Sequence, residues 1–114
     1  MPFIDSKVSV KTTPEQRKEL KEKLGQAIAI LPGKSERWLM IDLADEQEMY
    51  MAGTADSPCA YISVNLFGEA QKSDYEKMTA ELTKIYGDIL GIAPDRMYIK
   101  YVGSYDWGWN GGNF

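Results

Sequence analysis

The sequence contains no histidine and only one cysteine, Cys59, among its 114 residues. Without histidine, serine–histidine and cysteine–histidine catalysis are both excluded. A single cysteine cannot form an intramolecular disulfide or a CxxC redox or zinc pair. Carboxylates and one thiol are then the remaining metal ligands, which fits a transition-metal site poorly. We therefore expect no metal, and we interpret Cys59 as a structural residue.

Long apolar runs and basic runs are also missing. No apolar stretch approaches the length of a membrane span, and the N-terminal residues lack the pattern of a signal peptide. We expect a cytoplasmic protein, with secretion by a route that needs no signal peptide left open. The formal net charge of −4 disfavours binding to a phosphate backbone. Nucleic acid and membranes are therefore not expected partners.

What is present is typical of one globular domain spanning residues 1–114. Hydrophobic residues make up 44% of the sequence and charged residues 26%. Two segments have the periodicity of amphipathic helices. The first follows a capping box at residues 13–16 and stops at 32–33, where Pro-Gly occurs. The second follows a similar pattern at residues 73–76, with Ser73 as the expected N-cap, and ends near Gly91.

Four β-branched and aromatic segments predict strands at residues 3–10, 38–43, 60–67 and 97–102. The order strand–helix–strand thus occurs twice, with helix starts about 60 residues apart, which indicates a duplicated βαβ unit. The predicted fold is α/β, of the α+β kind: a four-stranded mixed sheet with both helices on one face. The other face of the sheet would be bare, so we expect a second copy of the chain to cover it and form a homo-oligomer.

The first candidate for chemistry is Pro2. A small second residue permits removal of Met1, which would leave Pro2 as a free secondary amine. Burial and a nearby cation would lower its pKa, so that it stays neutral and accepts a proton. The alternative interpretation is that Pro2 only permits removal of Met1.

A cation and a tyrosine are further candidates. Lys34 follows the helix stop and lies at the mouth of a strand, where it could hold a substrate carboxylate. Tyr98 and Lys100 point the same way from the last strand, and Tyr98 could donate a hydrogen bond. The alternatives are a solvated loop lysine and a tyrosine that packs in the sheet core or at an interface.

Aromatic residues could form an apolar pocket, and several lie in the tail at residues 103–114. That tail has no helical period, so we expect its aromatics to dock on a neighbour or wall a pocket. Packing in a core or interface is the alternative for all of them. The pocket candidates are Trp38, Phe67, Trp107, Trp109 and Phe114.

Taken together, these residues resemble the macrophage migration inhibitory factor family of the tautomerase superfamily. The resemblance runs from end to end of the sequence. Its specificity for this family comes from the combination of motifs, since no single motif would be specific. It is carried by Met-Pro-Phe-Ile at 1–4, Gly-Lys at 33–34, Ser-Pro-Cys-Ala at 57–60, Pro-Asp-Arg-Met-Tyr-Ile at 94–99, Gly-Trp-Asn at 108–110 and Phe114.

The resemblance implies a homotrimer whose sheets form a central barrel, with active sites between subunits and no cofactor. It implies that Pro2 is the catalytic base and Lys34 the carboxylate-binding cation, with Tyr98 reaching in from a neighbouring subunit. Phe67 falls where the family has an aliphatic residue whose backbone contributes to the site. Trp38, Trp109 and Phe114 would line the pocket. The implied reaction is keto–enol tautomerisation of a small aromatic α-keto acid such as phenylpyruvate.

The sequence also departs from the family. Lys100 stands where the animal proteins have an asparagine at the pocket floor, and this second cation could favour more acidic substrates. Trp107 adds bulk near the mouth, and the run that begins at Cys59 lacks the family's CxxC. Two other hypotheses stay open: a cytokine-like protein that binds a host receptor, and a ferredoxin-like regulatory domain that binds a small ligand. The second leaves Pro2 and the aromatic tail unexplained.

Overall fold

The computed structural model describes residues 1–113. Three one-turn 3-10 segments accompany the strands and helices. In chain order the elements are β1 (Pro2–Val8), α1 (Pro14–Ala27), η1 (Ile28–Ile30), η2 (Glu36–Trp38), β2 (Met40–Ala44), β3 (Ala60–Phe67), α2 (Lys72–Leu90), η3 (Pro94–Arg96), β4 (Met97–Ser104), β5 (Gly108–Trp109) and β6 (Gly112–Asn113).

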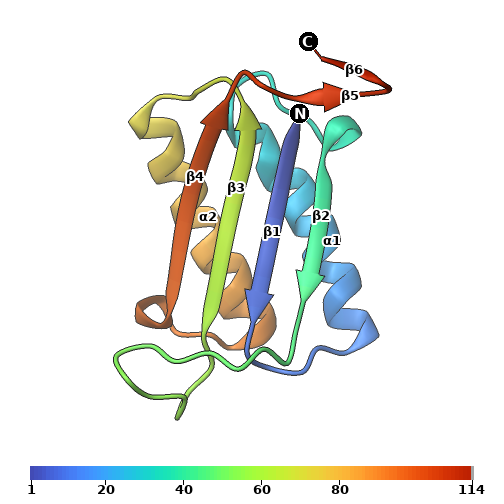
Figure 1. The fold of residues 1–114 in the computed structure, drawn as a ribbon. Helices are drawn as coiled ribbons and strands as arrows, with labels where there is room; N and C mark the ends of the chain where they lie inside the picture. The colour runs from blue at the N-terminus through green and yellow to red at the C-terminus, as the bar shows by residue number, and fades with distance from the viewer. Residues whose placement is uncertain (114) are drawn as a thin grey trace.

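The main sheet has the strand order β2-β1-β3-β4 (Figure 1). Strands β1 and β2 run parallel, as do β3 and β4, while β1 and β3 meet antiparallel at the centre. Each parallel pair is joined through a helix, and both helices cover the same face of the sheet. The expected mixed sheet with two helices on one face is confirmed.

The strands differ slightly from the sequence prediction at their ends. β1 begins at Pro2 and ends at Val8, and β2 begins at Met40 because Trp38 belongs to the 3-10 turn before it. β4 continues to Ser104, which is paired with Phe67 at the end of β3. The central strand β3 has the predicted bounds.

The predicted capping box of α1 is confirmed. Thr13 accepts a hydrogen bond from the Gln16 backbone N–H at 3.1 Å, and the Gln16 side chain accepts one from the Thr13 N–H at 2.9 Å. The regular helix ends at Ala27, before Pro32, and the chain tightens into η1. The two orphan N–H groups at the start of α1 are thus both satisfied.

The predicted N-cap of α2 is wrong. The cap residue is Gln71, with no side-chain hydrogen bond, and Ser73 lies in the first turn. Just before this start, the Tyr75 hydroxyl accepts a hydrogen bond from the Ala70 N–H at 3.0 Å, and the Tyr75 ring stacks on Tyr101 of β4. The predicted end is confirmed, since Gly91 caps the helix in the left-handed region at φ 69°.

The core lies between the sheet and the two helices, and a fully buried hydrogen bond joins β1 to α2 across it. The Tyr86 hydroxyl on α2 donates to the Ser6 hydroxyl on β1 at 2.6 Å, and burial raises the pKa of Tyr86 to about 12. Tyr86 belongs to a core that includes the fully buried aliphatic side chains of Ile4, Leu24 and Ile62.

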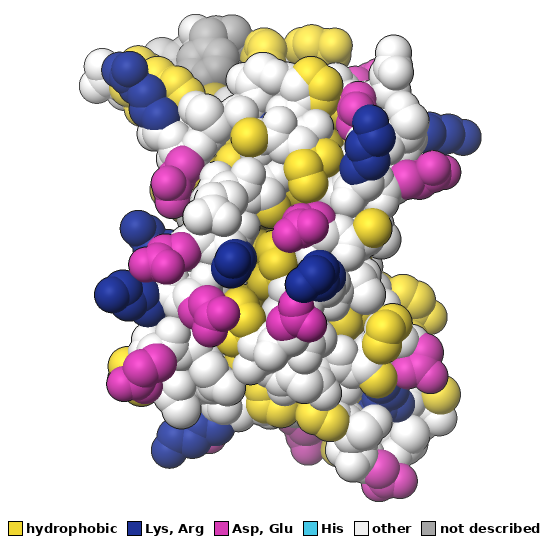
Figure 2. Space-filling view, turned by 180° about the vertical axis from the view of Figure 1, so that it is seen from behind, with side chains coloured by type: hydrophobic (Ala, Val, Ile, Leu, Met, Phe, Trp, Pro, Cys, Tyr) yellow, Lys and Arg dark blue, Asp and Glu magenta, His cyan; other side chains and the backbone are white. Residues whose placement is uncertain are grey.

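The two faces of the molecule differ in chemistry. The helical face carries scattered side chains of both charges (Figure 2). The bare sheet face is mixed: Asp5 and Lys7 form an ion pair on β1, while Tyr98 is 68% exposed on β4. None of the described helices is long and apolar enough to cross a membrane.

Candidate functional site

The N-terminus lies beside the start of β2 and the hairpin β5–β6 (Figure 1). Pro2 is buried at the start of β1 and is paired with Leu66 of β3. The Met1 carbonyl accepts a hydrogen bond from the Phe67 N–H at 3.0 Å. The first two residues are therefore held in the sheet rather than left as a loose end.

Lys34 approaches this terminus from the loop after η1. Gly33, at φ 77°, makes the left-handed turn that leads into it. The Lys34 ammonium donates to the Phe67 carbonyl at 2.8 Å and lies 6.0 Å from the centre of the Phe67 ring. Partial burial, and secondly the charge of Lys34, lower the pKa of the Met1 terminal amine. The structure thus brings a cation to the chain terminus.

Two adjoining cavities open at this terminus, and they share Met1, Trp38 and Trp109 in their walls. The first, of about 440 Å³, also contacts Gly33, Lys34 and Phe67. The second, of about 450 Å³, is also lined by Pro2, Phe3, Arg37, Leu39, Met40, Trp107 and Gly108. Each volume is in the range of small-molecule sites.

Two tryptophans make the wall common to both cavities. The rings of Trp38 and Trp109 meet edge to face, with centres 5.3 Å apart. Trp109 is held by the hairpin, which turns at Asn110 and Gly111, both with positive φ. Trp109, from the tail, thus lies in the wall of both cavities. Nearby, the indole N–H of Trp107 is buried and finds no hydrogen-bond partner in the part of the chain that is described.

Tyr98 and Lys100 are not brought to these cavities within one chain. Their partners across the ladder are Tyr61 and Ser63, whereas Phe67 pairs with the far end of β4 at Ser104. Both side chains are exposed on the bare face of the sheet. One chain therefore gathers Pro2, Lys34, Trp38, Phe67, Trp107 and Trp109 without them, and Phe114 lies outside the described residues.

Sequence reasoning missed Arg37 and Tyr105 at this site. Arg37 lines the second cavity, with its guanidinium carbon 5.2 Å from the centre of the Trp38 ring. Tyr105 packs edge to face on Phe67 at 5.3 Å. The position of Arg37 directly before Trp38 is visible in the sequence. The 3-10 turn that aims the Arg37 side chain over the Trp38 ring is visible only in the structure.

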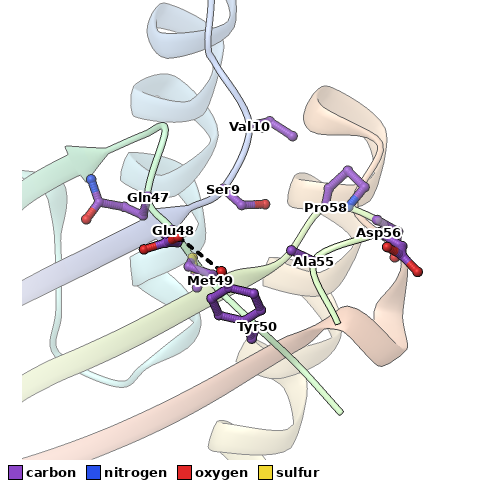
Figure 3. A pocket seen from close by; sticks show the side chains of 10 residues that line it. Ser9, Val10, Gln47, Glu48, Met49, Tyr50, Ala55, Asp56 and Pro58 are labelled. Atoms are coloured by element: carbon purple, nitrogen blue, oxygen red, sulfur yellow. Dashed lines mark hydrogen bonds between the residues drawn. The ribbon is translucent and has the colours of Figure 1, made fainter. Parts of the chain in front are cut away.

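A separate cavity of about 430 Å³ lies at the opposite end of the sheet (Figure 3). Its lining mixes polar and apolar side chains, and Tyr50 donates to Glu48 at 3.0 Å across its rim. None of the candidate residues named from the sequence lines it. Within residues 1–113 we find no cluster of three or more acidic or thiol side chains that could hold a metal ion.

Comparison with known proteins matches the whole chain to a family. The model of the family described as macrophage migration inhibitory factor (MIF) matches residues 1–114. The chain belongs to the macrophage migration inhibitory factor family. The resemblance seen in the sequence is thereby confirmed, and with it the place of the chain in the tautomerase superfamily.

Individual relatives agree with this family. The chain is 32% identical over 119 residues to the macrophage migration inhibitory factor of Meriones unguiculatus, covering 100% of this chain and 97% of that protein. It is 35% identical over 96 residues to the protein of that name from Rattus norvegicus, covering 80% of each. Among solved structures, MIF2 of Leishmania major superposes with a TM-score of 0.92 at 31% identity, covering 100% of this chain and 97% of that one.

Proposed function

We propose that this protein is a cofactor-independent keto–enol tautomerase of α-keto acids such as phenylpyruvate, with Pro2 as general base. The observation that carries the proposal is the meeting of the chain terminus with Lys34 in cavities walled by tryptophan. Membership of the tautomerase superfamily supports the reaction class.

Removal of Met1 is the first requirement. While Met1 is attached, the Pro2 nitrogen is an amide and has no basic lone pair. After removal it is a secondary amine in the same partly buried place, near Lys34. We expect both influences that lower the pKa of the Met1 amine to act on the Pro2 amine as well, which favours the neutral form that can take a proton from carbon.

Lys34 has two roles in this mechanism. Its ammonium group anchors the substrate carboxylate, and the same positive charge stabilises the negative charge that develops on the enolate. The backbone carbonyl of Phe67 holds the ammonium in place. The proton held by Pro2 then returns to another atom of the substrate, which completes the tautomerisation. Trp38 and Trp109 supply the apolar wall for an aryl side chain.

Tyr98 and Lys100 belong to this site only if a neighbouring subunit lends them. Both are exposed on the bare sheet face, far along β4 from the cavities of their own chain. A homotrimer that covers this face would place them in a cleft between subunits, where Tyr98 donates a hydrogen bond to the substrate and Lys100 adds a second cation.

The experiment pairs mass spectrometry with a phenylpyruvate tautomerase assay. Protein that has lost Met1 should turn over phenylpyruvate, and protein carrying one extra N-terminal residue should show at least a hundredfold lower kcat/KM, because its Pro2 nitrogen is an amide. Equal activity in both forms would rule out Pro2 as base. Processed protein that is inert but binds a receptor ectodomain would favour the cytokine hypothesis instead.

A further inference from the structure

The two halves of the fold each carry an arginine in a 3-10 turn before their second strand, Arg37 in η2 and Arg96 in η3. The two terminal nitrogens of the Arg96 guanidinium hold the loop before β3. It donates hydrogen bonds of about 3.0 Å to the carbonyls of Met51, Thr54 and Ser57 and to the Cys59 sulfur.

Arg37 has no such structural task. Within residues 1–113 we find no carboxylate or carbonyl bonded to it, and its one specific contact is the face of Trp38. Its neighbour Glu36 does not neutralise it, because the Glu36 carboxylate is folded against Gly25 of α1. A guanidinium stacked on an indole keeps its N–H edge free to bind an anion.

The position of Arg37 relative to Lys34 defines a two-ended site. Lys34 lines the first cavity and Arg37 the second, and Met1 lies in the wall of both. Removal of Met1 takes away a side chain that lines both cavities. None of the described residues lining either cavity is acidic, although the whole chain has a formal net charge of −4. The joined cavity thus has a cation at each end and no built-in counter-ion.

We propose that the site accepts dianionic 2-oxo acids, with the carboxylate next to the keto group at Lys34 and a second carboxylate at Arg37. The proposal rests on the proposed function and names its preferred substrate class. A planar guanidinium binds a carboxylate through two parallel hydrogen bonds, which fixes the orientation of the distal end as well as its charge. The tryptophan wall between the cations suits an aryl or alkyl linker.

The experiment compares phenylpyruvate with 4-carboxyphenylpyruvate, which adds one distal carboxylate. The readout is the ratio of kcat/KM for the dianion to that for the monoanion in processed protein. We expect Arg37→Gln to lower this ratio about tenfold or more through KM, the effect of losing a charge-assisted hydrogen bond. Arg37→Lys should restore part of it. Lys18→Gln, which removes an exposed charge on α1, is the matched control and should keep the ratio.

An unchanged ratio in Arg37→Gln would overturn the proposal, as would a loss that appears in Lys100→Gln instead. Binding to the Pro2→Gly variant, followed by quenching of tryptophan fluorescence, separates this proposal from the proposed function. If the processed wild type turns over neither substrate but Pro2→Gly still binds the dicarboxylate in an Arg37-dependent way, the proposed tautomerase function fails and the dianion site stands. If the processed wild type turns over both substrates and Pro2→Gly binds the dicarboxylate no better than the monoanion, only the dianion site fails.

Discussion

In the proposed mechanism, single residues at the chain terminus carry the chemistry. The terminal amine is partly buried, Lys34 lies close enough to lower its pKa, and the Phe67 carbonyl fixes the Lys34 ammonium. Each of these contacts is local, so each can be changed without altering the fold.

Lys34 should control the pH dependence of the reaction. A general base works when it is unprotonated, so kcat/KM should rise with pH around the pKa of the Pro2 amine. The positive charge of Lys34 disfavours the ammonium form and lowers that pKa. Lys34→Gln should therefore move the midpoint to higher pH, with a raised KM. The pH profile of kcat/KM measures this shift.

Lys34→Arg is the control for charge alone. It keeps the positive charge and should keep the midpoint near that of the wild type, even if the altered shape raises KM. A midpoint that stays in place in Lys34→Gln would show that the charge of Lys34 does not act on the base.

At the scale of elements, the helix starts illustrate how local and tertiary forces differ. α1 begins at a reciprocal capping box written in the sequence at residues 13–16, whereas α2 begins at Gln71 without a side-chain cap. The start of α2 is set from outside, because Tyr75 holds Ala70 and stacks on Tyr101 of β4 at 4.4 Å.

This difference predicts unequal costs for two similar substitutions. Thr13→Ala should lower the free energy of unfolding by about 1 kcal/mol, because it leaves the Gln16 N–H without its acceptor. Ser73→Ala should change it by less than about 0.5 kcal/mol, because Ser73 caps nothing. Urea denaturation at one protein concentration measures both. Equal losses would mean that Ser73 does act as the cap in solution.

The elements were thus largely predictable from the sequence, and the site only in part. Alternating β-branched segments and the Thr13 capping box are local signals, so the strands and α1 followed from them. The N-cap of α2 did not follow from local signals, because a contact with a strand far along the chain competes with the local capping pattern. Arg37 was missed for a similar reason: its neighbour Trp38 is visible in the sequence, but the turn that aims the guanidinium over that ring is not.

At the scale of the whole molecule, the bare sheet face and the incomplete site both favour an assembly of several copies of the chain. Pro2 and Lys34 lie at one end of the sheet, while Tyr98 and Lys100 are exposed toward the other. The sequence predicts the bare face, but periodicity within one chain contains no signal for the number of copies. The homotrimer is therefore a proposal that joins these residues across an interface.

Mixing two inactive variants tests the shared site. Pro2→Gly and Tyr98→Ala should each be inactive alone, and mixed trimers should regain activity. About a quarter of the sites in an equal random mixture would combine a wild-type Pro2 with a wild-type Tyr98 from the next subunit. Native mass spectrometry should show three copies per particle. No recovery in verified mixed trimers would show that Tyr98 does not serve a neighbouring site.

The central claim is that the Pro2 amine is the base, and one measurement tests it most directly. Phenylpyruvate tautomerase activity should be compared between processed wild type, Pro2→Gly and Pro94→Ala, the last a change at an exposed proline in η3. We predict that Pro2→Gly loses about a hundredfold or more in kcat/KM and that Pro94→Ala loses almost nothing. Wild-type kcat/KM in a correctly processed Pro2→Gly protein would contradict the account.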